Sequence, residues 1–385
     1  MDNKFTFIDL FAGIGGFHVA LSNHGGECVY ASEIDKNAAL VYQQNHKLAP
    51  FGDITKKEIK DKIPDNFDVL CAGFPCQPFS KGGHQKGFDD TRGTLFFDIC
   101  EITQKHKPKI LFLENVSNLV THDKGNTYKV ILKHLDELGY VFPHTPLILS
   151  ADEFGVPMLR KRIYIPAIRK DLIKQRDFIE NFDLSEYKTP VEPIDNYLDL
   201  DYKNDLSEYE EKILEMWNQF YQGIDLDVIG FPIWSEYFKY DGAMDFPKWK
   251  KDFILKNKAL YERNKEFIDK WYKKWDNLEW VNPTHKKMEW QAGKQESIYD
   301  TLIQFRPSGV RVKRSDKFST FVAMNHQQII GKLKRKLTKD EAKLLLNFPK
   351  NFKLHENDNI AFKQLGNSVS VKVVSLIFEK IKGFL

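Results

Sequence analysis

The sequence places Cys76 between two prolines, in the stretch GFPCQPFS that runs from Gly73 to Ser80. The apolar run DVLCAG, residues 68–73, comes directly before it. Two prolines three residues apart cannot continue a strand ladder, so the chain must turn there and present what lies between them. A thiol presented in this way is either a core group packed at the end of a strand or a nucleophile, and this stretch alone leaves both interpretations open.

An acid and two arginines follow at the ends of other apolar runs. Glu114 ends the run KILFL and begins ENV, while Arg160 and Arg162 alternate into the β-type run RIYIPAI. A carboxyl group in a half-buried site keeps its proton to a higher pH, as a functional acid requires. Residues i and i+2 share one face of a strand, so both guanidinium groups could point into one cleft. The alternatives are a helix-capping glutamate and a solvated edge strand.

A glycine-rich turn follows the first apolar run, in FAGIGGFH. Gly13 and Gly15 allow a tight turn and close approach of a ligand to the backbone. Glu33 and Asp53 stand at expected strand ends, where carboxylates can accept hydrogen bonds from ribose or adenine groups. The pattern is not the dinucleotide G-x-G-x-x-G, and several carboxylates favour S-adenosylmethionine, a sulfonium cation, over a pyrophosphate. The alternative is a glycine turn without a ligand.

The elements that must position these residues are short β-type runs that alternate with helical stretches, at residues 5–10, 27–33, 68–73, 109–115 and 162–168. This alternation predicts an α/β fold with a parallel, doubly wound sheet, whose strands have their carboxyl ends at the ligand crevice. A final helix within 368–385 is expected to pack back on this sheet. We divide the chain into a catalytic domain (1–185), a second, smaller domain (186–354) and a returning segment (355–385).

Composition describes an ordinary globular protein, with 42% hydrophobic and 29% charged residues in 385. No apolar run approaches the roughly 18 residues that span a bilayer, so we expect no membrane association. The four cysteines lack metal-ligand spacing, which predicts reduced thiols, no metal and a cytoplasmic protein. All seven tryptophans lie between Trp217 and Trp290, and we expect most of these aromatics to form a small core. Residues 306–340 are strongly basic and suit phosphate contacts.

Together these motifs resemble the series of the DNA cytosine-5 methyltransferases. They occur in the family's order from residue 5 to about 370: FAGIGGFH, GDIT, GFPCQPFS, DDTRGTLFFDI, LENV, the Arg-x-Arg run and QLGNSV. The resemblance implies a Rossmann-like methyltransferase sheet with a smaller target recognition domain. It also implies transfer of a methyl group from S-adenosyl-L-methionine, leaving S-adenosyl-L-homocysteine, to carbon 5 of cytosine.

The resemblance further assigns roles to single residues. Cys76 would add to carbon 6 of the ring, Glu114 would donate to ring nitrogen 3, and Arg162 and Arg160 would hold the carbonyl oxygen or a phosphate. Residues 81–90 would form a loop that closes over a flipped base. The cofactor pocket would be formed by Phe11, Gly13, Gly15, Glu33, Ile34, Asp53, Ile54, Pro75, Leu95, Asn367 and Ser368.

The partners implied are double-stranded DNA, read at a specific sequence, and a cognate restriction endonuclease, with the protein itself a monomer. Two alternatives stay open. The first is a tRNA cytosine-5 methyltransferase of the same family, although the Cys-Phe-Thr sequence typical of that branch has no equivalent here. The second is a catalytically silent DNA-binding relative, against which the intact Cys76, Glu114 and glycine turn argue.

Overall fold

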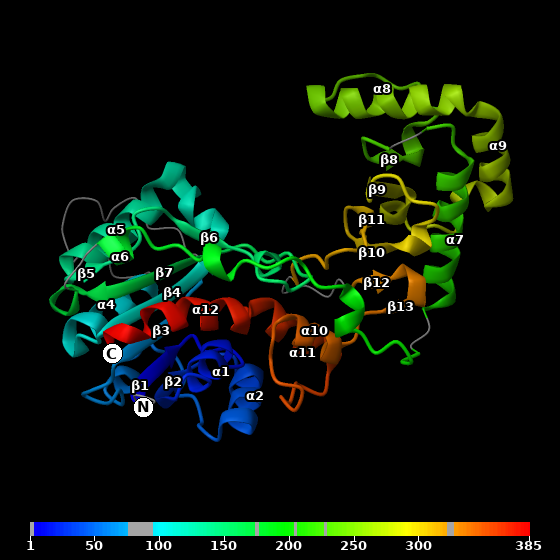
Figure 1. The fold of residues 1–385 in the computed structure, drawn as a ribbon. Helices are drawn as coiled ribbons and strands as arrows, with labels where there is room; N and C mark the ends of the chain where they lie inside the picture. Colours follow the sequence, from blue (N-terminus) through cyan, green and yellow to red (C-terminus); the bar gives the residue numbers. More distant parts are fainter. Residues whose placement is uncertain (1–3, 76–94, 174–176, 204–205, 227–228, 322–326) are drawn as a thin grey trace. The chain divides into compact units, whose positions relative to one another are not determined.

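The computed structural model describes residues 4–75, 95–173, 177–203, 206–226, 229–321 and 327–385. The chain forms two compact units (Figure 1). The first takes Met1–Glu192, Thr320–Met324 and Ala342–Leu385, and the second takes Pro193–Ser319 and Asn325–Glu341. Within the described ranges, no helix has both the length and the apolar character needed to cross a bilayer.

The first unit is built on a seven-stranded sheet with the strand order β2-β1-β3-β4-β7-β5, in which β6 also pairs with β7. Its first four strands are parallel, and each apolar run predicted from the sequence is a strand. The strands are β1 (Phe5–Leu10), β2 (Gly26–Ser32), β3 (Val69–Gly73), β4 (Ile110–Val116), β5 (Tyr140–Val141), β6 (Leu147–Leu149) and β7 (Arg162–Arg169). The helices are α1 (Gly16–Ser22), α2 (Lys36–His46), α3 (Lys57–Lys60), α4 (Leu95–His106), α5 (Asn126–Glu137), α6 (Asp177–Glu180), α11 (Asp358–Asn367) and α12 (Val371–Ile381).

Helices cover both faces of this sheet (Figure 1). The strands carry buried apolar side chains on both of their faces, and each face must be covered by other apolar side chains. On one face, side chains of β1, β3 and β4 pack with Phe96 and Ile99 of α4 and Ile131 of α5. On the other, Phe17 of α1 packs edge-on against Phe112. The predicted C-terminal helix is α12, and its Phe378 ring lies 5.0 Å from that of Phe5, so the expected return to the first sheet is confirmed. The doubly wound α/β fold is therefore confirmed as well.

The strand over residues 162–168 was predicted to be parallel, and that prediction is wrong. β7 runs antiparallel to β4, with Glu114 opposite Tyr164 and Val116 opposite Arg162. The chain between the two strands does not make a single helical crossover; it passes through α5 and the short strands β5 and β6, both antiparallel to β7. Because of this direction, the beginning of β7 lies at the carboxyl end of β4, which brings Arg162 to the edge where Glu114 stands.

The second unit has a six-stranded sheet of order β13-β12-β10-β11-β9-β8. Its elements are α7 (Glu208–Gly223), β8 (Ile233–Trp234), α8 (Lys248–Arg263), α9 (Lys265–Lys274), β9 (Lys287–Gln291), β10 (Thr301–Arg306), β11 (Gly309–Arg314), β12 (Ile329–Ile330) and β13 (Arg335–Lys336). Trp217, Trp271, Trp275 and Trp290 are buried in one core with Phe220, which confirms the prediction that most aromatics here form a small core.

The boundaries of the units differ from those expected. The first unit extends to Glu192, because the segment after residue 185 is bonded back to it: Glu192 N donates to Gly155 O, and Thr189 N donates to Glu153 O. After the short segment Thr320–Met324, which also belongs to the first unit, the chain returns to that unit at Ala342, within α10 (Lys339–Leu345), earlier than residue 355. The buried Leu345 and Leu346 belong to its core, and Leu346 O accepts from Val371 N.

Candidate active site

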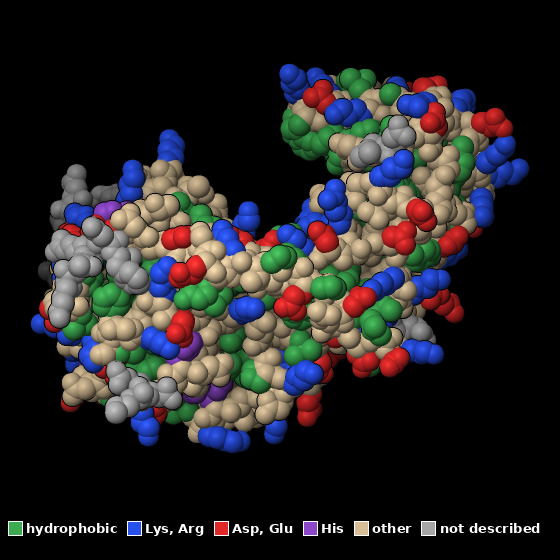
Figure 2. Space-filling view, viewed as in Figure 1, with side chains coloured by type: hydrophobic (Ala, Val, Ile, Leu, Met, Phe, Trp, Pro, Cys, Tyr) green, Lys and Arg blue, Asp and Glu red, His purple; other side chains and the backbone are tan. Residues whose placement is uncertain are grey.

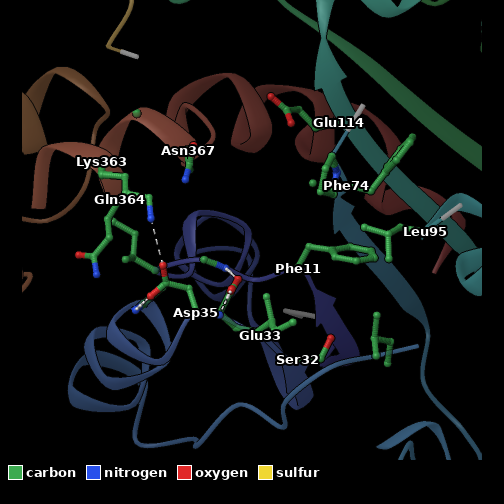
Figure 3. Close-up of a pocket in the computed structure, with 18 of the residues that line it drawn as sticks. Phe11, Ser32, Glu33, Asp35, Phe74, Leu95, Glu114, Lys363, Gln364 and Asn367 are labelled. Atoms are coloured by element: carbon green, nitrogen blue, oxygen red, sulfur yellow. Dashed lines mark hydrogen bonds and ion pairs between the residues drawn. The ribbon is translucent and has the colours of Figure 1, made fainter. Parts of the chain in front are cut away.

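A cavity of about 520 Å³ opens in the first unit at the carboxyl ends of β1, β3 and β4 (Figure 3). This is the edge where parallel α/β sheets bind ligands. The sequence predicted that residues far apart in the chain would meet here, and the lining includes Phe11, Gly13, Glu33, Ile34, Asp53, Ile54, Pro75, Leu95, Glu114, Arg160, Arg162 and Asn367. Of the predicted residues that the structure describes, Gly15 and Ser368 are not part of the lining.

The glycine turn between β1 and α1 forms one wall of the cavity. Phe11 and Gly13 have positive φ angles of 54° and 56°. Gly15 has φ 92°, and a Cβ there would lie 2.2 Å from His46 Nε2. His46 fills the space behind the turn and contacts Ile14 O at 3.3 Å. Gly15 therefore shapes the turn, whereas Gly13 faces the cavity.

Glu33 holds this turn through both of its carboxylate oxygens. Oε2 accepts from Gly13 N at 2.7 Å, and Oε1 accepts from Asp35 N at 2.7 Å. Burial raises the pKa of Glu33, and these two backbone N–H groups oppose that rise. Figure 3 shows the Glu33 side chain beside Ser32 on one side of the cavity, with Glu114 and Asn367 on the other. Each oxygen keeps a lone pair that could accept a hydrogen bond from a bound hydroxyl group.

Further carboxylates continue the acidic end of the cavity. Asp35 caps α2 through Asn37 N and Ala38 N, and its Oδ2 lies 3.5 Å from Lys363 Nζ of α11 (Figure 3). The sequence predicted that Asp53 ends a strand, and this prediction is wrong. The loop before Asp53 forms only an isolated bridge to the end of β2. Its Oδ1 accepts from Thr55 N and Thr55 Oγ1, which lowers the pKa of Asp53.

Glu114 and Arg162 form an ion pair at the opposite end of the cavity. Arg162 Nε lies 3.1 Å from Glu114 Oε1, and both side chains are largely buried. Burial raises the pKa of Glu114, while Arg162 and Arg160 oppose that rise. The pair results from the antiparallel direction of β7, since a parallel strand would have placed Arg162 at the far edge of the sheet. A buried acid beside a guanidinium is suited to binding a polar ring with both donor and acceptor groups.

Arg160 is positioned differently from Arg162. Its side chain is buried, and Nη2 donates to Gly366 O at 3.0 Å and also to Ser368 O. Burial lowers the pKa of Arg160 to about 9. Since backbone carbonyls occupy this nitrogen, Arg160 fixes the QLGNSV segment that brings Asn367 into the cavity, and Ser368 contributes its carbonyl to that tie.

Asn115 and Lys363 are among the lining residues that were not predicted from the sequence. Asn115 Nδ2 donates to Phe74 O at 2.8 Å, which ties the end of β4 to the chain just before Cys76. The signal available was the polar pair Glu-Asn at the end of an apolar strand. Lys363 was missed because a lysine on a helix, directly before QLGNSV, is typical of an ordinary surface residue. The predicted nucleophile Cys76 and the loop 81–90 lie outside the described residues.

The other three cysteines are unsuited to nucleophilic work. Burial raises the pKa of Cys28 to about 12 and raises the pKa of Cys71 and Cys100 as well. The thiolate is the reactive form of cysteine, so none of these three would be ionised near neutral pH. No group of three or more histidine, cysteine, aspartate or glutamate side chains in the described ranges could hold a metal ion.

Comparison with known proteins places the chain in a family. Residues 5–383 match the model of the C-5 cytosine-specific DNA methylases. The chain is 34% identical over 372 residues to Type II methyltransferase M.HhaI of Haemophilus parahaemolyticus, covering 96% of this chain and 92% of that protein. It is 50% identical over 218 residues to Type II methyltransferase M.HpaII of Haemophilus parainfluenzae, covering 54% of this chain and 60% of that protein.

A solved structure shares the fold over the whole chain. It is described as a putative DNA modification methyltransferase encoded within a prophage of Escherichia coli, with a TM-score of 0.57, 20% identity and 99% of each chain covered. The fold and the cavity define a Rossmann-like methyltransferase. The chain belongs to the C-5 cytosine-specific DNA methylase family. It is accordingly a DNA cytosine-5 methyltransferase, as the resemblance implied.

The cavity fits the cofactor expected of such an enzyme. Glu33, Asp35 and Asp53 give one end a negative character, which suits the sulfonium and ammonium groups of S-adenosylmethionine. Ile34 lines the same end and is 71% exposed, so an apolar surface is available for a flat ring.

Proposed function

We propose that this enzyme transfers a methyl group to carbon 5 of a cytosine at a specific sequence in double-stranded DNA, through base flipping and a covalent bond from Cys76 to carbon 6. The observation that carries the proposal is the placement of Glu114 and Arg162 in the same cavity as the acidic cofactor end. Pro75, the residue bonded to Cys76, lines that cavity. A base that reaches Glu114 from a stacked duplex must first leave the stack.

Glu33, Ile34 and Asp53 would hold the ribose and adenine of S-adenosylmethionine, with Phe11, Gly13, Ile54, Pro75, Leu95 and Asn367 completing the pocket. Bound there, the cofactor supplies an electrophilic methyl group. Gly15 and Ser368 would support the pocket without lining it. Gly15 allows the turn between β1 and α1, and the Ser368 carbonyl accepts a hydrogen bond from Arg160. Arg160 is thus a positioning residue for the cofactor pocket.

Cys76 would act as the nucleophile because carbon 5 of cytosine is too weak a nucleophile by itself. Addition of the thiolate to carbon 6 breaks the aromatic system and makes carbon 5 electron-rich. Glu114, protonated, donates to ring nitrogen 3 and accepts from the exocyclic amine, so it stabilises the charge that develops on the ring. Arg162 would then turn from Glu114 to the carbonyl oxygen of the base. After methylation, carbon 5 loses its proton and the carbon–sulfur bond breaks, which frees Cys76.

The second unit would read the target sequence. It lies between two segments of the first unit in the chain and has its own aromatic core, as a recognition module requires. The relatives named above are Type II methyltransferases, and this supports a place for the enzyme in a restriction-modification system beside a cognate endonuclease.

A mechanism-based trap tests the proposal. Duplex DNA copied with 5-fluoro-2′-deoxycytidine is incubated with the protein and S-adenosylmethionine, and adducts that survive denaturation are counted on a gel. Fluorine at carbon 5 cannot leave as a proton does, so the final elimination is blocked. Wild-type protein should form the adduct, and Cys76→Ala should form none.

Cys28→Ala is the matched control, since it removes a thiol that burial keeps protonated, and it should trap DNA as the wild type does. An adduct that persists in Cys76→Ala would refute the assignment of the nucleophile. Parallel reactions with tritiated cofactor, DNA and tRNA separate the substrates. Label in tRNA alone would exclude the DNA reaction, and no label in either would indicate a silent binder.

A further inference from the structure

Helix α8 of the second unit carries lysines that the protein leaves without acidic partners. It holds six basic and two acidic residues, a net charge of +4 in sixteen residues. Lys248, Lys251, Lys256 and Lys258 form no ion pair with any carboxylate in the described part of the chain, whereas Arg263 pairs with Asp225. Figure 2 shows the blue side chains gathered along this helix, at the top of the second unit.

Five of the ten cations in residues 306–340, the segment that the sequence singled out, form ion pairs inside the second unit. Arg311 lies 2.7 Å from a Glu289 oxygen, and Arg335 is buried against Glu341 at 2.6 Å. Other pairs are Arg306 with Glu289, Lys332 with Asp195, and Lys336 with Glu210. A phosphate would have to compete with these carboxylates, so much of the charge counted in the sequence is already neutralised.

Three of the α8 lysines lie on one flank of the helix. At about 100° per residue, Lys248, Lys251 and Lys258 fall within a sector of roughly 80°. The buried residues of α8, which include Ile254 and Asn257, centre roughly 120° away around the helix. Asn257 Oδ1 accepts from Trp234 N at 2.9 Å, and its Nδ2 donates to Pro232 O at 3.0 Å, so α8 is tied to the segment around β8. The lysines therefore extend from a fixed platform.

We propose that α8 is a phosphate-contacting element, in which Lys248, Lys251 and Lys258 bind the backbone of duplex DNA and add affinity that does not depend on sequence. The partner follows from charge complementarity, because three lysines without ion pairs outnumber the one carboxylate on that flank, Glu262, and such a surface suits a polyanion. The exposed Trp249 and Leu255 lie about 120° apart around the helix, so they do not form one apolar patch for a protein partner. The inference rests on the proposed function, since it takes DNA as the substrate.

The test is the salt dependence of DNA binding by the triple variant Lys248→Gln/Lys251→Gln/Lys258→Gln. Glutamine keeps helix propensity, and the three side chains have no described ion pairs to lose. Binding to a labelled random-sequence duplex is followed by anisotropy between about 50 and 200 mM salt. The slope of log Kd against log salt should fall by about 0.9 for each lost phosphate contact, thus by about 2.7 for the three lysines.

A matched control removes the same charge from the first unit. Lys57, Lys105 and Lys129 are exposed on α3, α4 and α5, and Lys57→Gln/Lys105→Gln/Lys129→Gln should keep the wild-type slope. A wild-type slope in the α8 variant overturns the inference, and so does an equal fall in both variants, which would reflect net charge alone. Failure of the proposed function would be seen in a different measurement, because the wild-type protein would then not methylate DNA at all.

Discussion

The substitution Glu33→Gln would test how the cofactor pocket is held. Glu33 accepts two backbone hydrogen bonds, from Gly13 N and Asp35 N, each at 2.7 Å. A glutamine has one acceptor oxygen, so one of the two N–H groups would face an amide NH₂ instead. A hydrogen bond to a charged group contributes about 1.5–3 kcal/mol. If that energy is lost from the cofactor complex, Kd for S-adenosylmethionine rises roughly 10- to 150-fold.

Calorimetric titration of the cofactor, together with separate KM values for cofactor and DNA, would measure this change. We expect KM for S-adenosylmethionine to rise and KM for DNA to stay near the wild-type value. Glu27→Gln is the control, because Glu27 is an exposed residue on β2, the strand that Glu33 follows, and lies outside the cavity. An unchanged cofactor Kd in Glu33→Gln, with normal thermal stability, would refute the role that we assign to this carboxylate.

Three other predictions follow from buried charges. Burial raises the pKa of Glu114, and the protonated form that the mechanism needs is lost as pH rises through that pKa. We therefore expect kcat to fall on the alkaline side of a pH–rate profile. Glu114→Gln should be slower than the wild type, and its kcat should not show this alkaline fall. Arg160→Met removes the nitrogen that donates to both carbonyls, and a loss of about 1.5–3 kcal/mol should lower Tm by about 3–12 °C in calorimetry and raise KM for the cofactor more than KM for DNA. Arg335→Met leaves Glu341 buried without its cation and should lower the free energy of unfolding by about 3–5 kcal/mol in urea titrations. The double variant Arg335→Met/Glu341→Leu should regain part of this lost stability, because the unpaired buried charge is then gone.

Much of the site could be predicted from local pattern. The apolar runs before Gly13, Glu33 and Glu114 give way to glycine or polar residues, so these three could be placed near strand ends without a structure. Parallel strands bring their carboxyl ends to one edge, so those residues could also be expected to meet there. The cavity lining bears out this reasoning for the described residues.

The errors arose where the partner of a residue is distant in sequence. Asp53 follows an isolated bridge, not a strand, because only Phe51 of its loop is hydrogen-bonded to the chain at the end of β2. That residues 306–340 contact phosphate stays a prediction, but the charge count behind it did not show that Arg335 pairs with Glu341 and Arg311 with Glu289. A charge count cannot reveal such pairing, since it depends on which side chains the fold brings within a few ångströms.

The sequence by itself determined the chemistry of this enzyme: the order and spacing of the motifs, the carboxylates at the strand ends, and a cysteine held between two prolines. These are local properties, fixed by backbone sterics and by the period of a strand. The tertiary structure alone decided the direction of β7, and with it the ion pair between Arg162 and Glu114. It also decided that Arg160 binds backbone carbonyls, and that several lysines of α8 form no ion pair in the described part of the chain. Strand direction and charge pairing depend on long-range packing, which no short stretch of sequence encodes.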